Sequence, residues 1–144
     1  MPIAIYPALL FTVALLVTTA YFLMGGLPLL VLDHDTALDA RFVRGFFNLY
    51  YKAAFATAVG AAVSYGCLGQ FGFALGAAGL ALVAVLLRRP LISTMDRLGA
   101  QIQVSTPQAV QRFRRLHGMA LLVNLVQLVL LVWALTRLSL SAQT

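Results

Sequence analysis

Hydrophobic positions divide the chain into four long apolar stretches separated by short polar segments. The stretches cover about residues 3–24, 46–65, 71–87 and 119–138. Each approaches the roughly 20 residues that an α-helix needs to cross the hydrocarbon core of a bilayer. No linker rich in Pro or Ser and no internal repeat interrupts this order. We therefore predict an all-α polytopic membrane protein, with residues 1–144 forming a single four-helix transmembrane domain.

Proline and glycine predict interruptions in two of these helices. Gly25, Gly26 and Pro28 follow the first stretch, where they predict a break or kink before an apolar tail that ends at residue 32. The third stretch ends at Arg-Arg-Pro, residues 88–90, and apolar residues then recur at helical spacing up to Ile102. This second pattern predicts a short interfacial amphipathic helix between the third and fourth spans.

The ends of the second and fourth helices carry recognisable signals. Thr36 or Asp35 suits the N-cap of the second helix, and Thr106-Pro107 suits the start of the last. The residues from 107 onward permit one unbroken helix through the fourth span. The first apolar stretch lacks a basic flank and is too long for a signal peptide, so we interpret it as a retained span.

Small residues recur every fourth position in the second and third spans. Examples are the rows Ala54-Ala58-Ala62, Gly72-Gly76 and Ala77-Ala81. Lipid provides no hydrophobic drive between helices, so helices associate where small side chains let their backbones approach. We expect these two spans, joined by a short uncharged turn, to form the closest pair.

The charge balance refines this picture. Ten Lys and Arg face four acidic residues, and charged residues make up 10% of the chain against roughly 25% in soluble domains. All cations except Arg137 lie in or beside the loops after the first and third spans. This asymmetry predicts that both loops face the cytoplasm of a bacterium, in its inner membrane, and that both termini lie outside.

The same cations suggest partners. We expect anionic lipid headgroups, not nucleic acid, to be bound by a set of arginines next to the spans: Arg88, Arg89, Arg112, Arg114 and Arg115. Tyr50, Tyr51 and Lys52 are typical of an interfacial belt with a snorkelling lysine. The single cysteine, Cys67, excludes a disulfide within the chain.

Candidate chemistry concentrates in the fourth span. His117, Asn124 and Gln127 share one side of a helix, because seven residues make two turns and three more add about 60°. This polar intramembrane face either binds a ligand or ion, or ties helices together with hydrogen bonds. His34 and His117 are the only histidines, so they are the low-odds metal or haem ligands. We predict no cofactor.

What the spans lack shapes the functional hypothesis. No acidic residue lies within any predicted span, and no catalytic triad, carboxylate pair or phosphate-binding loop occurs. We expect an accessory or scaffold subunit, without catalysis of its own, that packs against other membrane subunits or a second copy. The alternatives are an oligomeric small-molecule or ion transporter and a His-ligated cofactor or metal protein.

Two motifs resemble a known family. Residues 113–118, FRRLHG, followed by Asn124-Leu125, are similar to F-x-x-L/Y-H-G-x-S-x-x-x-N-L of the transmembrane-protein-205-like family (domain of unknown function 4149). Residues 42–51 resemble that family's F-x-R-x-x-F-P-x-Y-Y. Ala120 replaces the Ser and Asn48 the Pro. The resemblance covers roughly residues 40–138 and implies a four-helix membrane fold, but no established activity.

Overall fold

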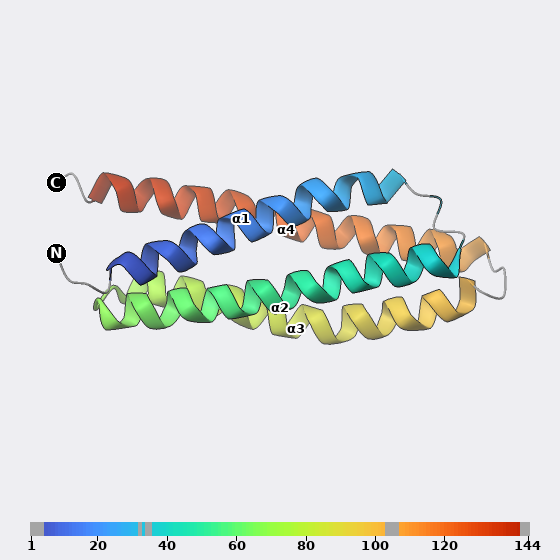
Figure 1. Cartoon of the computed structure of the whole chain (residues 1–144), viewed down its shortest axis with the longest axis horizontal. Helices are drawn as coiled ribbons and strands as arrows, with labels where there is room; N and C mark the ends of the chain where they lie inside the picture. Colours follow the sequence, from blue (N-terminus) through green and yellow to red (C-terminus); the bar gives the residue numbers. More distant parts are fainter. Residues whose placement is uncertain (1–4, 32, 34–35, 103–106, 142–144) are drawn as a thin grey trace.

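The computed structural model describes residues 5–31, 33, 36–102 and 107–141, with the backbone alone for 138–141. Within these residues the chain forms four α-helices: α1 (Ile5–Val31), α2 (Ala37–Cys67), α3 (Phe71–Ile102) and α4 (Pro107–Ser141). They run up and down in a single elongated bundle, as Figure 1 shows. The prediction of an all-α four-helix fold is confirmed. Three of the helices, α1, α3 and α4, are long and apolar enough to cross a membrane.

Helix α2 differs in composition from the other three. Its first half carries four charged residues, and its second half consists largely of Ala, Gly, Ser, Thr and Tyr. Even so, α2 turns large apolar side chains such as Phe55, Val59 and Val63 outward. Exposed apolar side chains of this kind cover the outer faces of α1, α3 and α4 as well, which is the opposite of a water-soluble bundle.

Close packing of small residues joins α2 to α3, and this pair has the most extensive contact in the bundle. Ala54 and Ala58 of α2 are buried in the same cluster as Ala81 and Ala84 of α3. The prediction that these two helices form the closest pair is confirmed. The Gly72-Gly76 row does not contribute, because a Cβ added to either glycine would meet nothing within 4 Å.

A tight turn connects α2 to α3. Gly69 has a φ of +71° and lies just after the C-cap residue Leu68. The Gly69 amide donates to the Gly66 carbonyl and the Gln70 amide donates to the Tyr65 carbonyl, both at 3.0 Å. These are the two hydrogen bonds of a Schellman motif, in which glycine is favoured because the left-handed conformation strains other residues. The motif sends α3 back antiparallel along α2.

Helix α1 does not break where the sequence predicted it to. It continues through Pro28 to Val31. The helix is closely packed just before Pro28: a Cβ on Gly25 would lie 2.8 Å from the Phe46 ring and one on Gly26 would lie 2.5 Å from Leu121. The two glycines therefore let α2 and α4 approach α1 closely on its inner side. Proline is tolerated in such packed helices because neighbouring groups compensate for the lost hydrogen bond.

The separate interfacial helix predicted between the third and fourth spans is also wrong. Residues 91–102 continue α3 without interruption past Pro90. The apolar stripe Met95, Leu98 and Ile102 is buried in the main core cluster and does not lie on a membrane surface. The stripe has the same helical spacing in both arrangements, so only the packing partner distinguishes a bundle helix from a surface helix. At the start of α2, Thr36 is the N-cap and accepts from the Asp39 amide at 3.2 Å, as predicted.

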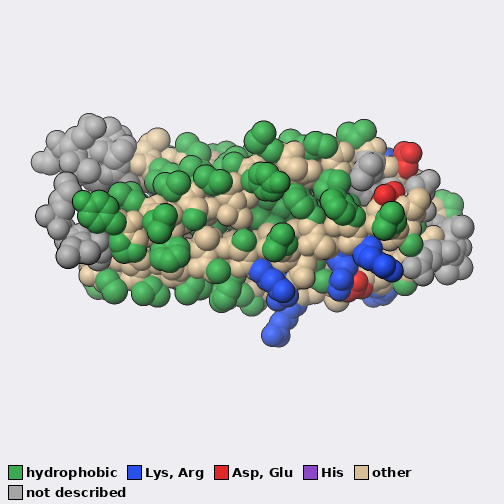
Figure 2. All heavy atoms as spheres, in the orientation of Figure 1, with side chains coloured by type: hydrophobic (Ala, Val, Ile, Leu, Met, Phe, Trp, Pro, Cys, Tyr) green, Lys and Arg blue, Asp and Glu red, His purple; other side chains and the backbone are tan. Residues whose placement is uncertain are grey.

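Cationic side chains gather at one end of the bundle. Figure 2 shows Lys and Arg over the half that carries the loops after α1 and α3, while the other half of this face is apolar. On α2 and α3 the cations reach inward as far as Lys52 and Arg88, and Arg88 donates to Asn48 Oδ1 at 3.0 Å. On α1 apolar residues continue to Val31. The boundary between apolar and charged surface is therefore oblique to the bundle.

A glycine substitution tests the packing of α1 on α2. A Cβ at Gly60 would lie 2.6 Å from ring carbons of Phe11, so we expect Gly60→Ala to lower the free energy of unfolding by about 1–2 kcal/mol. Gly79 on α3 has nothing within 4 Å of an added Cβ, so Gly79→Ala is the matched control. It should be neutral or add up to about 1 kcal/mol through helix propensity. Reversible unfolding in mixed micelles measures both, and equal effects would contradict the packing.

Candidate functional site

The polar residues of α4 point into the bundle. His117 is fully buried, Asn124 is 3% exposed and Gln127 is half-buried. The His117 and Phe47 rings, from α4 and α2, form a T-shaped pair with 5.1 Å between their centroids. The structure thus places all three predicted residues on the inner side of α4, at successive levels along the helix.

Hydrogen bonds join two of these residues to other helices. Asn124 Oδ1 accepts from the Tyr50 hydroxyl of α2. Gln127 Nε2 donates to Thr19 Oγ1 of α1 at 3.3 Å, and Thr19 in turn donates to the Leu15 carbonyl at 2.7 Å. Because buried polar groups are costly unless they are bonded, these contacts hold α4 in register with α1 and α2. We refer to Thr19, Tyr50, Asn124 and Gln127 as the polar layer.

Aromatic rings enclose the polar layer on the cation-bearing side. Phe22 of α1 stacks on Tyr50 with 4.0 Å between centroids, and it contacts Phe46 and Phe47 at 4.9 and 4.8 Å. Tyr51 lies beside Tyr50 at 5.2 Å. Such ring pairs fix side-chain positions as well as filling space. These rings therefore pack around the polar layer and restrict the positions of its side chains.

The predicted interfacial belt of Tyr50, Tyr51 and Lys52 is corrected in part. Both tyrosines are 5% exposed and belong to the core, and only Lys52 is exposed. The sequence carried a signal for this, because Val43, Phe47, Tyr50, Ala54, Ala58, Ala61 and Tyr65 recur every three or four residues. That spacing defines one face of a helix, and all of these residues are buried.

The arginines predicted to contact lipid headgroups do not form one site. Arg88 is half-buried and bonded to Asn48, whereas Arg89, Arg112, Arg114 and Arg115 are exposed. Arg44, which the prediction did not include, forms an ion pair with Asp96 across α2 and α3. Arg88 and Arg44 therefore connect these two helices.

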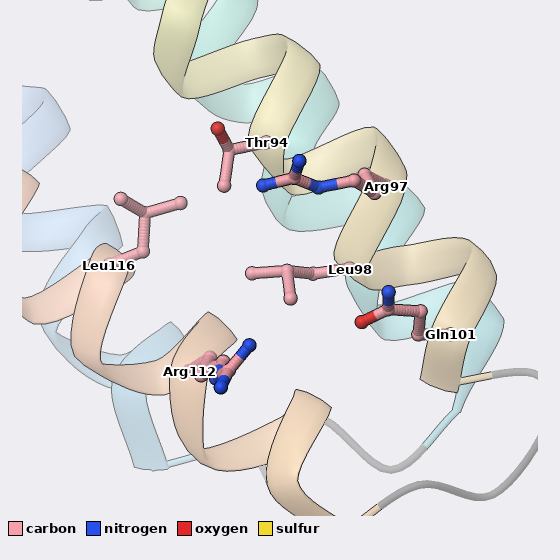
Figure 3. Close-up of a pocket in the computed structure, with 6 residues that line it drawn as sticks. All are labelled: Thr94, Arg97, Leu98, Gln101, Arg112 and Leu116. Atoms are coloured by element: carbon pink, nitrogen blue, oxygen red, sulfur yellow. The ribbon is translucent and has the colours of Figure 1, made fainter.

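A basic pocket opens between α3 and α4 near their cation-bearing ends. Its volume is about 380 Å³, and it is lined by Thr94, Arg97, Leu98 and Gln101 of α3 and by Arg112 and Leu116 of α4. Figure 3 shows the two arginines reaching toward the space between the helices. Sequence reasoning missed Arg97 and Gln101 as site residues. Their four-residue spacing beside the apolar stripe of α3 was the available signal.

An apolar groove lies between the same two helices in the other half of the bundle. Its volume is about 470 Å³, and Gly72, Gly76, Leu130 and Trp133 are among the residues that line it. Thr12 and Tyr65, also lining residues, are buried and joined by a 3.0 Å hydrogen bond between their hydroxyls. The groove is thus an apolar depression with polar groups of its lining already bonded to each other.

The metal hypothesis rests on residues that the structure describes only in part. His34 lies outside the described residues, and His117 is deep in the bundle against Phe47. Among the described residues, no group of three or more His, Cys, Asp or Glu side chains is close enough together to hold a metal ion. Cys67 is exposed at the turn between α2 and α3.

Comparison of the chain with protein-family models, with curated proteins and with solved structures finds no match. The resemblance to the transmembrane-protein-205-like family therefore rests on the two motifs alone. The structure gives those motifs a physical setting, since His117 and Asn124 of one and Phe47 and Tyr50 of the other meet inside the bundle.

A double-mutant cycle tests the polar layer. We expect Tyr50→Phe and Asn124→Leu to be coupled by about 0.6–1.7 kcal/mol in the free energy of unfolding, between the average and the maximum measured for hydrogen bonds between membrane helices. Tyr21 is 74% exposed, so Tyr21→Phe combined with Asn124→Leu is the control and should show additive effects. Additive effects in the Tyr50 cycle would mean that the bond between α2 and α4 contributes nothing.

Proposed function

We propose that this protein is a non-catalytic accessory subunit of the bacterial inner membrane, which docks a transmembrane helix of another subunit. The observation that carries the proposal is the apolar groove between α3 and α4. A partner helix seated there would cover Gly72 and Gly76, which line the groove and have open space where a side chain would be. Glycines four residues apart permit close helix approach in lipid.

The interior of the bundle supports a structural role. Tyr50 bonds Asn124 and Gln127 bonds Thr19, so these polar groups serve contacts between helices of the same chain. On the outside of the bundle, Arg44 and Asp96 pair with each other. The groove, by contrast, is apolar and faces outward. Substrate sites usually combine a concave surface with a few polar groups that orient the ligand. This groove is concave but apolar, so it suits another apolar surface.

One observation favours a second candidate, an oligomeric transporter that uses the polar face of α4. Asn124 Nδ2 is buried, and among the described residues it has no hydrogen-bond acceptor. A donor of this kind inside a bundle is available to a passing ligand. None of the pockets described above, however, is lined by His117, Asn124 or Gln127. Four helices enclose little space, so a path would require several copies.

The proposal includes an arrangement in the membrane. In it α2 crosses the bilayer with α1, α3 and α4, because its alanines pack along α3 and it exposes apolar side chains on its outer face. The cation-bearing end with the loops after α1 and α3 faces the cytoplasm, and both termini lie outside. The helices reach about 40–52 Å, more than the hydrocarbon thickness, so that end extends through the headgroup layer.

Reporter fusions test this topology. A periplasm-active phosphatase fused after residue 144 should be active, and the same enzyme inserted after Asp33 should be inactive. A reporter active only in the cytoplasm, placed at the same two points, is the reciprocal control. Cytoplasmic activity at residue 144 would overturn the assignment.

A substitution in the groove tests the docking proposal. We expect Gly76→Leu to fill the groove and to abolish co-purification of the partner subunit in mild detergent, without loss of folding, since a Cβ at Gly76 meets nothing within 4 Å. Gly79→Leu is the matched control, because Gly79 is on the same helix, is equally open, and does not line the groove. The measurement is quantitative mass spectrometry of the proteins that co-purify with each variant.

Two results would count against the docking proposal. One is a wild-type protein that purifies as a lone monomer with no other polypeptide. The other is a partner lost equally from the Gly76→Leu and Gly79→Leu variants, which would place the contact elsewhere on α3.

A further inference from the structure

The basic pocket between α3 and α4 brings together positive charge for which the described residues supply no acidic partner. Arg97 and Arg112 come from different helices and line the same space of about 380 Å³. Among the described residues, the acidic side chain that forms an ion pair is Asp96, and its partner is Arg44. This pair lies on the opposite side of α3, which faces α2. Two cations that line one space without a carboxylate make that space attractive to an anion.

The other lining groups suit an oxyanion. Thr94 offers a hydroxyl and Gln101 an amide N–H₂, both on the same side of α3 as Arg97. Arginine presents a planar fork of N–H donors that matches the oxygens of phosphate and carboxylate groups. Several donors arranged around one space are the usual means of holding a phosphate, because each of its oxygens accepts more than one hydrogen bond.

The pocket is also amphipathic. Leu98 of α3 and Leu116 of α4 line it together with the polar groups, and Leu98 is buried in the main core cluster. The pocket lies toward the cation-bearing ends of α3 and α4 (Figure 3). Its volume falls within the range of roughly 300–1,000 Å³ that is typical of small-molecule sites.

We propose that this pocket is a binding site for a phosphate group, held between the guanidinium groups of Arg97 and Arg112 with Thr94 and Gln101 as further donors. Either the headgroup of an anionic phospholipid or a free phosphate supplies this chemistry. The proposal does not depend on the docking groove, which lies in the other half of the bundle and shares no lining residue with the pocket.

The experiment uses the full chain purified in a neutral detergent. In one arm, inorganic phosphate is titrated into the protein at low ionic strength and followed by calorimetry. In the other, native mass spectrometry measures binding of phosphatidylglycerol against phosphatidylcholine, whose phosphate is neutralised by its own ammonium group. The pocket variant is Arg97→Gln/Arg112→Gln. The control, Arg41→Gln/Lys52→Gln, removes the same charge from exposed positions within the same cationic region, outside the pocket.

We expect the pocket variant to weaken binding by at least about tenfold, since hydrogen bonds to charged groups are among the stronger ones. The control should change binding by less than about twofold, because exposed charges at a distance are screened. Loss in the phosphatidylglycerol arm alone assigns the site to a lipid headgroup, and loss in the inorganic phosphate arm assigns it to a free anion.

Two outcomes overturn the proposal. One is an absence of binding by the wild-type protein in both arms. The other is an equal loss in the pocket variant and the control, which would mean that the general positive charge of this end attracts the anion. Circular dichroism of each variant checks that the helices are retained, and both arginines are exposed enough for their replacement to leave the core intact.

Discussion

The bundle depends on how closely its helices can approach one another. Lipid chains solvate apolar side chains as well as a helix partner does, so burial alone holds nothing together in a bilayer. Alanines supply the approach between α2 and α3, where Ala54, Ala58, Ala81 and Ala84 share one core. Glycines supply it at α1, where Gly25 and Gly26 admit Phe46 and Leu121. Within this packing α1 and α3 continue as helices past Pro28 and Pro90.

Polar side chains connect helices that lie too far apart for close backbone contact. Helices α2 and α4 are diagonal to each other and have no close backbone contact among the described residues. The bond from Tyr50 to Asn124 reaches across this diagonal, and Gln127 reaches Thr19 on α1. Phe22 and Phe47 pack around these groups. The polar layer thus holds α1, α2 and α4 in register with one another.

Two spaces open between α3 and α4, one in each half of the bundle. In the apolar half the gap is the groove beside Gly72 and Gly76, and in the cation-bearing half it is the pocket between Arg97 and Arg112. The two spaces differ in chemistry because the charge boundary crosses the bundle between them. Our two proposals, a helix in the groove and a phosphate in the pocket, follow from that difference.

The sequence by itself determined the fold class, the cap at Thr36, the pairing of α2 with α3 and the inward position of Asn124, since each follows from local spacing or residue size. Tertiary structure alone decided whether helices continue past proline, because neighbouring helices compensate for a lost hydrogen bond that the local sequence leaves open. It also decided that Tyr50 meets Asn124 across the bundle and that Arg97 and Arg112 line one pocket. Spacing along one helix shows on which face a side chain lies, but only the packing of the helices decides which residues that face contacts.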